Sequence, residues 1–257
     1  MSKSIIVAQL YTLRDFMKTP EDLSVTFKKV KEIGYNAVQV SGIGPIEDEF
    51  IKEVAKREDL NICATHIAYD RFSSDMEGVI KEHKLWNCEY VGIGAMPEVY
   101  RGSKEGFIKF AKEASDYGKI LLENGLHLIY HNHNFEFKKF DGLTGLEILF
   151  QETDPRYFQF EIDTYWVQVG GGDPIAWIKK MKGRMDVVHF KDMVTSSNNT
   201  QIMAEVGEGN LNWEGIIGAC DDIGAKWCAV EQDKCERDPF ESLKISLQNL
   251  KKLGCKF

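Results

Sequence analysis

The 257-residue chain has no hydrophobic run long enough to cross a membrane, since its longest fully apolar stretches are only a few residues. Residues 1–10 lack the cationic region followed by an apolar core that a secretory signal peptide requires. We therefore expect a cytoplasmic protein with no membrane partner. The six cysteines are scattered and form no Cys-x-x-Cys motif, which predicts reduced thiols that serve mostly in packing.

An excess of basic residues is also missing. Asp and Glu number 40 against 32 Lys and Arg, which gives a formal net charge of −8 and a pI near 5.4. Because proteins that grip phosphate backbones are usually basic, we expect no nucleic-acid partner. Proline is scarce, at six residues, while 43% of the chain is hydrophobic and 28% is charged. This composition is typical of a soluble globular protein with an ample core, as one large domain or two small ones.

Strand-like and helix-like segments alternate eight times along the chain, with no linker or low-complexity segment between them. The first helix has clear boundary signals: Thr19 can cap it, Pro20 fits its first turn and Gly34 can end it. Alternation of this kind implies a parallel sheet. Eight units fit a single closed (β/α)8 TIM barrel better than an open doubly wound sheet, and we therefore expect one domain over residues 1–257.

Four of the predicted strands carry two ionisable residues near their ends, spaced two apart; these strands cover residues 126–134, 158–166, 185–192 and 226–233. In chain order the pairs are His131 and His133, Glu161 and Asp163, His189 and Lys191, and Glu231 and Asp233. Side chains two apart on a strand share a face, and buried charges are normally paired, hydrogen-bonded or bound to metal. Active sites of (β/α)8 barrels lie at the C-terminal ends of the strands. The sequence therefore predicts a divalent-cation site of imidazoles and carboxylates at that end.

Six segments of the chain resemble the sugar isomerase/epimerase family with xylose-isomerase-like barrels, and the resemblance spans essentially the whole chain. The segments are His131–Phe137, Glu161–Trp166, Gly170–Pro174, His189–Asp192, Val206–Trp213 and Val230–Asp233. Ketose 3-epimerases and inosose dehydratases of this group bind a divalent metal through Glu, Asp, His and Glu. Asp163, His189 and Glu231 match the last three positions. His131 stands at the first position, where those epimerases have glutamate. The resemblance implies one divalent ion, with Mn, Co, Mg and Zn all open.

The resemblance further implies an enzyme that moves a proton next to the carbonyl of a keto-sugar or related polyol. A metal would chelate the carbonyl and an adjacent hydroxyl oxygen and stabilise an enediolate, while a carboxylate removes and returns the proton. Glu231 is the expected base. His131, His133 and Glu136 are candidates for a second acid on the opposite face of the sugar.

Several neighbouring residues have predicted supporting roles. Lys191 should face the same cavity, where it can donate to a substrate hydroxyl, stabilise an enolate oxygen, or pair with a strand-end glutamate. Glu161 and Asp233 are expected to orient lysine or histidine side chains. Relatives place a substrate-binding histidine at the position of His66, and Trp166 is a candidate to stack on a sugar face. For His133, substrate contact and structural hydrogen bonding both remain open.

Alternative functions need different features. If a β-leaving group departs from the same intermediate, the enzyme is a lyase, either an inosose dehydratase or a keto-glycoside eliminase. A non-catalytic sugar-binding protein is a further alternative. An apurinic-site endonuclease of similar fold would need a three-zinc cluster, but Trp166 stands three residues after Asp163, where those enzymes carry another histidine.

The expected substrate is not phosphorylated. No strand end or helix start carries clustered Arg or Lys, and the glycine run 170–172 is followed by Asp173 and Pro174, which already supply a helix cap and first turn. A free sugar, keto-glycoside or cyclitol fits these observations, and homo-oligomerisation is left open. The polar stretch 194–210 is predicted to be a long loop.

Overall fold

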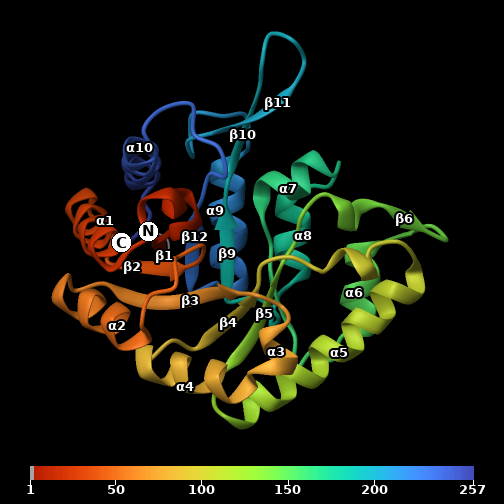
Figure 1. Cartoon of the computed structure of the whole chain (residues 1–257). Coiled ribbons are helices and arrows are strands. Elements are labelled where there is room, and N and C mark those ends of the chain that lie inside the picture. The colour runs from red at the N-terminus through yellow and green to blue at the C-terminus, as the bar shows by residue number, and fades with distance from the viewer. Residues whose placement is uncertain (1–2) are drawn as a thin grey trace.

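An eight-stranded sheet forms the centre of the computed structural model, which describes residues 3–257 (Figure 1). Its strands are β1 (Ile5–Gln9), β2 (Ala37–Val40), β3 (Asn61–Ile67), β4 (Tyr90–Ile93), β5 (His127–His131), β8 (Gln159–Glu161), β9 (Val187–Phe190) and β12 (Trp227–Val230). Hydrogen-bonded neighbours follow the order β8-β5-β4-β3-β2-β1-β12-β9, and all of these pairs are parallel. A parallel bridge between Asp163 and His189 joins the two end strands. The predicted (β/α)8 barrel is thereby confirmed in a nearly closed form.

Helices alternate with the strands and surround the barrel (Figure 1). They are α1 (Pro20–Ile33), α2 (Asp48–Arg57), α3 (Arg71–Ser74), α4 (Met76–Trp86), α5 (Lys104–Glu123), α6 (Gly145–Glu152), α7 (Thr164–Val169), α8 (Pro174–Lys180), α9 (Trp213–Ile223) and α10 (Pro239–Lys252). Short 3-10 turns cover Leu10–Phe16, Glu98–Tyr100 and Phe135–Phe137, and a two-residue hairpin pairs β6 (Lys139–Phe140) with β7 (Leu143–Thr144). Among the described residues, no helix combines the length and apolarity that a membrane span needs.

The predicted boundaries of α1 are confirmed. Thr19 accepts a hydrogen bond from the backbone of Asp22, Pro20 occupies the first turn, and Gly34 ends the helix with a φ of 116°. This left-handed backbone is the conformation that glycine adopts without a steric penalty.

The inside of the barrel is filled by a separate apolar cluster that includes Val7, Ala37, Tyr90, Ile129, Val187 and Ala229. In six strands the residue two positions beyond a member of this cluster is polar, and it therefore faces the same interior at the C-terminal end of the strand. These polar residues are Gln9, Gln39, His66, His131, His189 and Glu231. The apolar plug closes the lower barrel, and the polar residues line its upper end.

The predicted strand 158–166 is too long. β8 ends at Glu161, and α7 begins at Thr164, so Trp166 lies on a helix. Thr164, Tyr165 and Trp166 favour strands by composition. The carboxylate of Asp163 nevertheless accepts the backbone N–H of Trp166 and caps the helix, which turns the chain away from the barrel.

The predicted loop 194–210 is also wrong in part, because most of it belongs to a hairpin. β10 (Asp192–Thr195) pairs antiparallel with β11 (Gln201–Ala204), and the hairpin projects above the barrel (Figure 1). Its base is held by Asp192, whose Oδ2 accepts the indole N–H of Trp213 at 2.6 Å and the backbone N–H of Gly207 at 2.9 Å. These bonds fix a polar segment over the C-terminal end of the barrel.

Candidate metal centre

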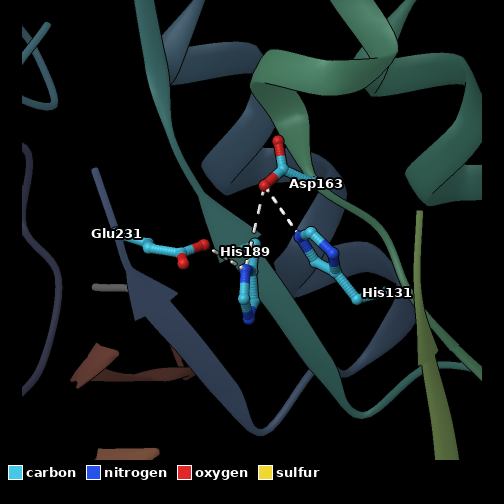
Figure 2. Close-up of side chains that lie close together, drawn as sticks. All are labelled: His131, Asp163, His189 and Glu231. Carbon is cyan, nitrogen blue, oxygen red and sulfur yellow. Dashed lines mark hydrogen bonds and ion pairs between the residues drawn. The ribbon is translucent and has the colours of Figure 1, made fainter. Parts of the chain in front are cut away.

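Four side chains from four consecutive strand ends converge on one point in the upper barrel (Figure 2). They are His131, Asp163, His189 and Glu231, each offering one ligand atom, and these atoms all lie within 4.8 Å of one another. His131 Nε2 lies 3.0 Å from Asp163 Oδ2, and His189 Nδ1 lies 2.9 Å from Glu231 Oε2. All four residues are buried. Two imidazoles and two carboxylates at this spacing could hold a divalent cation.

Each histidine of this set has one ring nitrogen occupied and the other aimed at the cluster. His131 Nδ1 donates to the carbonyl of Gly94 at 3.1 Å. His189 Nε2 donates to Gln39 Oε1 at 2.8 Å and lies 3.2 Å from Glu161 Oε1. An acceptor on the far nitrogen fixes the ring and leaves the near nitrogen available for a metal. The donor set therefore fits a divalent ion.

Asp163 divides its two oxygens between structure and site. Oδ1 accepts the N–H of Trp166 at 2.8 Å and caps α7, while Oδ2 faces His131 and the ammonium of Lys191 at 3.0 and 3.2 Å. The backbone N–H of Asp163 donates to Asn132 Oδ1 at 3.1 Å. One oxygen is thus held in place with the helix and the other is presented to the cluster.

Lys191, the residue directly after β9, enters the same cluster, as the spacing of two from His189 predicts. Its Nζ lies 2.8 Å from Glu231 Oε2, 3.2 Å from Asp163 Oδ2 and 3.0 Å from Asp233 Oδ2. The side chain is 1% exposed, so its charge is compensated almost entirely by these three carboxylates. The predicted ion pair with Glu231 is present, and Asp233 orients the lysine.

The opposite charges in the cluster shift the pKa values of its members so that each keeps its charge. Burial alone would lower the pKa of His189, but the carboxylates of Glu161 and Glu231 outweigh it and raise that pKa to about 10. Burial alone would raise the pKa of Glu231, but Lys191 and His189 hold that pKa well below its usual range. Burial would also raise the pKa of Asp163, but Lys191 and His131 outweigh it and lower that pKa. Glu231 and Asp163 are therefore ionised at neutral pH.

His66 and Glu161 form a second pair beside the cluster. His66 Nε2 lies 2.5 Å from Glu161 Oε2, and the other oxygen of Glu161 accepts from Gln39 Nε2 at 2.8 Å. The ring of His66 stacks on that of His189 at 5.2 Å. Glu161 thus contacts two histidines, as its position predicts, and His66 lines a cavity together with His131 and Glu231 of the candidate metal centre.

This cavity has a volume of about 330 Å³ and is the right size for a small ligand. Its walls include His66, His131, His133, Glu231 and Asp233. Four of the predicted substrate or catalytic residues, His66, His131, His133 and Glu231, therefore line one cavity.

His133 lies beyond the end of β5, where its ring packs at 4.8 Å from that of His131 and 5.4 Å from that of Trp166. Burial, together with the neighbouring His131 and Lys191, lowers the pKa of His133 to about 2, so its ring is neutral at neutral pH. Among the described residues, His133 Nδ1 and Trp166 Nε1 are buried polar atoms with no protein partner. Unpartnered polar atoms at a cavity are candidates to bind a ligand.

Glu136 is placed differently from the other predicted site residues. It is fully buried, its Oε1 accepts the hydroxyl of Tyr130 at 2.5 Å, and its Oε2 accepts the backbone N–H of His133 at 2.9 Å. It does not belong to the lining of the 330 Å³ cavity. Its contacts fix the segment that carries His133.

Two residues that shape the site, Gln39 and Gly92, were not predicted from the sequence. Gln39 bridges His189 and Glu161, and its signal was a lone amide in the apolar strand Ala37–Val40. Gly92 makes room for His66, because a Cβ there would lie 2.6 Å from His66 Cδ2 and 2.2 Å from the carbonyl oxygen of Thr65. That close approach depends on strand pairing and has no sequence signal.

The fold and the strand-end cluster together define a sugar-isomerase-type barrel. A sequence model described as the xylose isomerase-like TIM barrel matches residues 27–253, and the chain belongs to this family.

Individual relatives share less than a third of their residues with this chain over the matched segments. Inosose dehydratase of Bacillus cereus (strain AH820) is 28% identical over 157 residues, covering 54% of this chain and 52% of the relative. The matched segments cover between 30% and 52% of the length of the curated relatives reported for this chain.

Solved structures agree with the fold along the whole chain. A sugar phosphate isomerase/epimerase from Parabacteroides distasonis ATCC 8503 has a TM-score of 0.81 at 22% identity, covering 97% of this chain and 98% of that chain. D-allulose 3-epimerase from Methylomonas sp. has a TM-score of 0.75 at 11% identity, covering 98% and 99%. At these identities the likeness concerns the fold alone.

Proposed function

We propose that this chain is a divalent-metal-dependent enzyme that moves a proton next to the carbonyl of a keto-sugar or related polyol, giving isomerisation or epimerisation. The observation that carries the proposal is the buried set of His131, Asp163, His189 and Glu231 at the floor of a cavity of about 330 Å³. Buried charge gathered at the C-terminal ends of barrel strands contributes little to folding and is typical of a catalytic centre.

A divalent ion in this set would supply Lewis acidity that polarises the substrate carbonyl. The residues around the ion would remove the proton and return it. Glu231 is ionised, lines the cavity, and directs only Oε2 at Lys191 and His189 in its described contacts. It is the proposed base. Lys191 would stabilise the developing oxyanion, since its ammonium is held rigidly by three carboxylates.

The opposite face of the substrate would meet the histidines. His133 is neutral with a free Nδ1, so it can donate to or accept from a sugar hydroxyl. His66 is held by Glu161 at the cavity wall and would bind another hydroxyl. Glu136 would act by fixing the backbone of His133.

The lining of the cavity supports a non-phosphorylated substrate. The side chains that form its walls include no arginine and no lysine, and Asp233 and Glu231 would repel a phosphate. We therefore propose a free sugar, keto-glycoside or cyclitol.

Elimination is the second candidate reaction. The curated relatives reported above are inosose dehydratases, which favours a lyase on the same residues. After Glu231 removes the proton, a β-leaving group would depart in place of reprotonation, and the neutral ring of His133 would stand next to it as hydrogen-bond donor.

The test is exchange of the substrate's α-hydrogen in D₂O, with Mn²⁺-loaded protein and a panel of keto-sugars and inosose. Exchange reports proton removal whether the product is an epimer or an alkene. Glu231→Gln keeps the shape and should slow exchange by ~10²–10⁴-fold, the usual contribution of an acid–base group. The exposed Glu214→Gln serves as control and should exchange at the wild-type rate. Absence of exchange with every substrate of the panel would contradict the proposed reaction.

A further inference from the structure

A second and larger cavity opens beside the metal centre. Its volume is about 610 Å³, and its apolar walls are formed by Tyr11, Tyr165, Trp166, Ile202 and Met203. Three elements contribute these side chains: the turn after β1, the helix α7, and the strand β11 of the projecting hairpin. Tyr11 is 36% exposed, so the cavity meets solvent on that side. Cavities lined by aromatic and aliphatic side chains are typical of ligand sites.

The two cavities adjoin each other. Tyr11 and Asp233 belong to the walls of both. Asp233 Oδ2 lies 3.0 Å from Lys191 Nζ, so the shared wall reaches the charged cluster directly. The two cavities are therefore divided only by shared wall residues, and a molecule bound over the candidate metal centre would reach the larger cavity past Tyr11 and Asp233.

Trp166 stands at the junction. Its indole lies 5.4 Å from the ring of His133 and 5.7 Å from Lys191 Nζ, both on the side of the metal centre, and it also forms a wall of the larger cavity. Its Nε1 is buried with no protein partner among the described residues. An indole with a free N–H at a junction between a polar and an apolar space can bind a molecule that has both kinds of surface.

We propose that the larger cavity binds an aryl group joined to the sugar, so that the substrate is an aryl keto-glycoside and not a free monosaccharide. This proposal rests on the proposed function, because it places the keto-sugar ring over the metal centre. The occupant is a flat apolar ring because Tyr165 and Trp166 offer aromatic surface and Ile202 and Met203 offer aliphatic surface. The polar members of the wall, Gln201, Asp233, Lys234 and Glu236, leave room for hydroxyl groups on that ring.

The probes are the methyl and phenyl β-glycosides of 3-keto-D-glucose, whose dissociation constants are measured by calorimetry with and without Mn²⁺. Burial of the phenyl ring should make its glycoside bind about tenfold to a hundredfold more tightly than the methyl glycoside. Ile202→Trp should fill the cavity and reduce this ratio to about one, with little change for the methyl glycoside. Val194→Trp is the matched control, since Val194 pairs with Ile202 across the hairpin and is not part of the cavity wall.

A milder variant guards against misfolding. Met203→Gln keeps the shape of the side chain, and it should lower the phenyl preference several-fold. Equal affinity of the wild type for the two glycosides would overturn the proposal, as would an unchanged preference in Ile202→Trp. Failure of the proposed function would look different. In that case the phenyl preference would persist, but neither glycoside would exchange its α-hydrogen in D₂O.

Discussion

The ammonium of Lys191 lies 2.8 Å from the carboxylate of Glu231, so the chain supplies its own cation to a residue of the candidate metal centre. The same ammonium lies 3.2 Å from Asp163, the other carboxylate of the set. Lysine and a divalent ion would therefore share two acceptors. In the proposed metal centre this arrangement would limit the affinity for metal, because the ammonium and the ion would compete for the same carboxylates.

Replacement of Lys191 by methionine should strengthen metal binding. Two unit charges about 4 Å apart interact by about 4 kcal/mol at an effective dielectric constant of 20, and removing the ammonium relieves such a repulsion. We expect the dissociation constant for Mn²⁺ to fall at least about tenfold, measured by calorimetry. Lys226→Met, at the opposite end of the barrel, should leave it unchanged. Weaker metal binding in Lys191→Met would show that the lysine supports the ion instead of competing with it.

Replacement of Gln39 by leucine should weaken metal binding. The amide accepts from His189 Nε2 and donates to Glu161, so its loss frees the imidazole to rotate and leaves two buried groups without a partner. Changes to groups that orient metal ligands typically cost about 10–100-fold in affinity, and we expect a loss of that size. Gln159→Leu, on strand β8, which does not pair with β2, should bind metal as the wild type does. Equal affinity in Gln39→Leu would contradict the orienting role.

Glu136 should make the stability of the protein depend on pH. Burial raises its pKa from 4.5 to about 7, although Tyr130 and the backbone of His133 oppose the shift. A group whose folded pKa is raised contributes stability that is fully present below its unfolded pKa and is lost as the pH rises through the folded pKa. The contribution of Glu136 to stability should therefore be lost between pH 4.5 and pH 7, and comparison with a variant at this position isolates it from the other titrating groups.

Glu136→Gln mimics the protonated side chain and removes this dependence. Relative to the variant, the wild type should lose roughly 3 kcal/mol of unfolding free energy across that window, as about 1.4 kcal/mol per pKa unit requires. Chemical denaturation of both proteins at pH 4.5, 6 and 8 gives the difference. The exposed Glu152→Gln should run parallel to the wild type, and a parallel course for Glu136→Gln would mean that Glu136 keeps its ordinary pKa.

Much of the barrel could be predicted from the sequence because two local signals agree. Apolar strands ending in pairs such as His189 and Lys191 fix both the interior face and the C-terminal end of the strand, and caps such as Thr19 fix the helix starts. The convergence of four strand ends then follows from barrel geometry.

The remaining features depend on contacts between distant segments. Trp166 lies in a run with strand propensity, and its backbone N–H donates to the carboxylate of Asp163, which caps a helix there. The hairpin of β10 and β11 depends on the bonds of Asp192 to Gly207 and Trp213, about 15–21 residues away along the chain. Gln39 reaches His189 across 150 positions of sequence, and no local pattern indicates such a partner.

The metal centre is tested most directly by Asp163→Asn. Asparagine caps helices as well as aspartate does, so α7 should persist while the charge facing His131 and His189 is lost. Asp173→Asn is the matched control, because Asp173 caps α8 and is not part of the cluster. The measurement is the number of Mn²⁺ ions bound per chain at equilibrium. We predict one ion for the wild type and for Asp173→Asn, and less than stoichiometric binding for Asp163→Asn under the same conditions. Full occupancy in Asp163→Asn would contradict the assignment of Asp163 as a ligand of the metal centre.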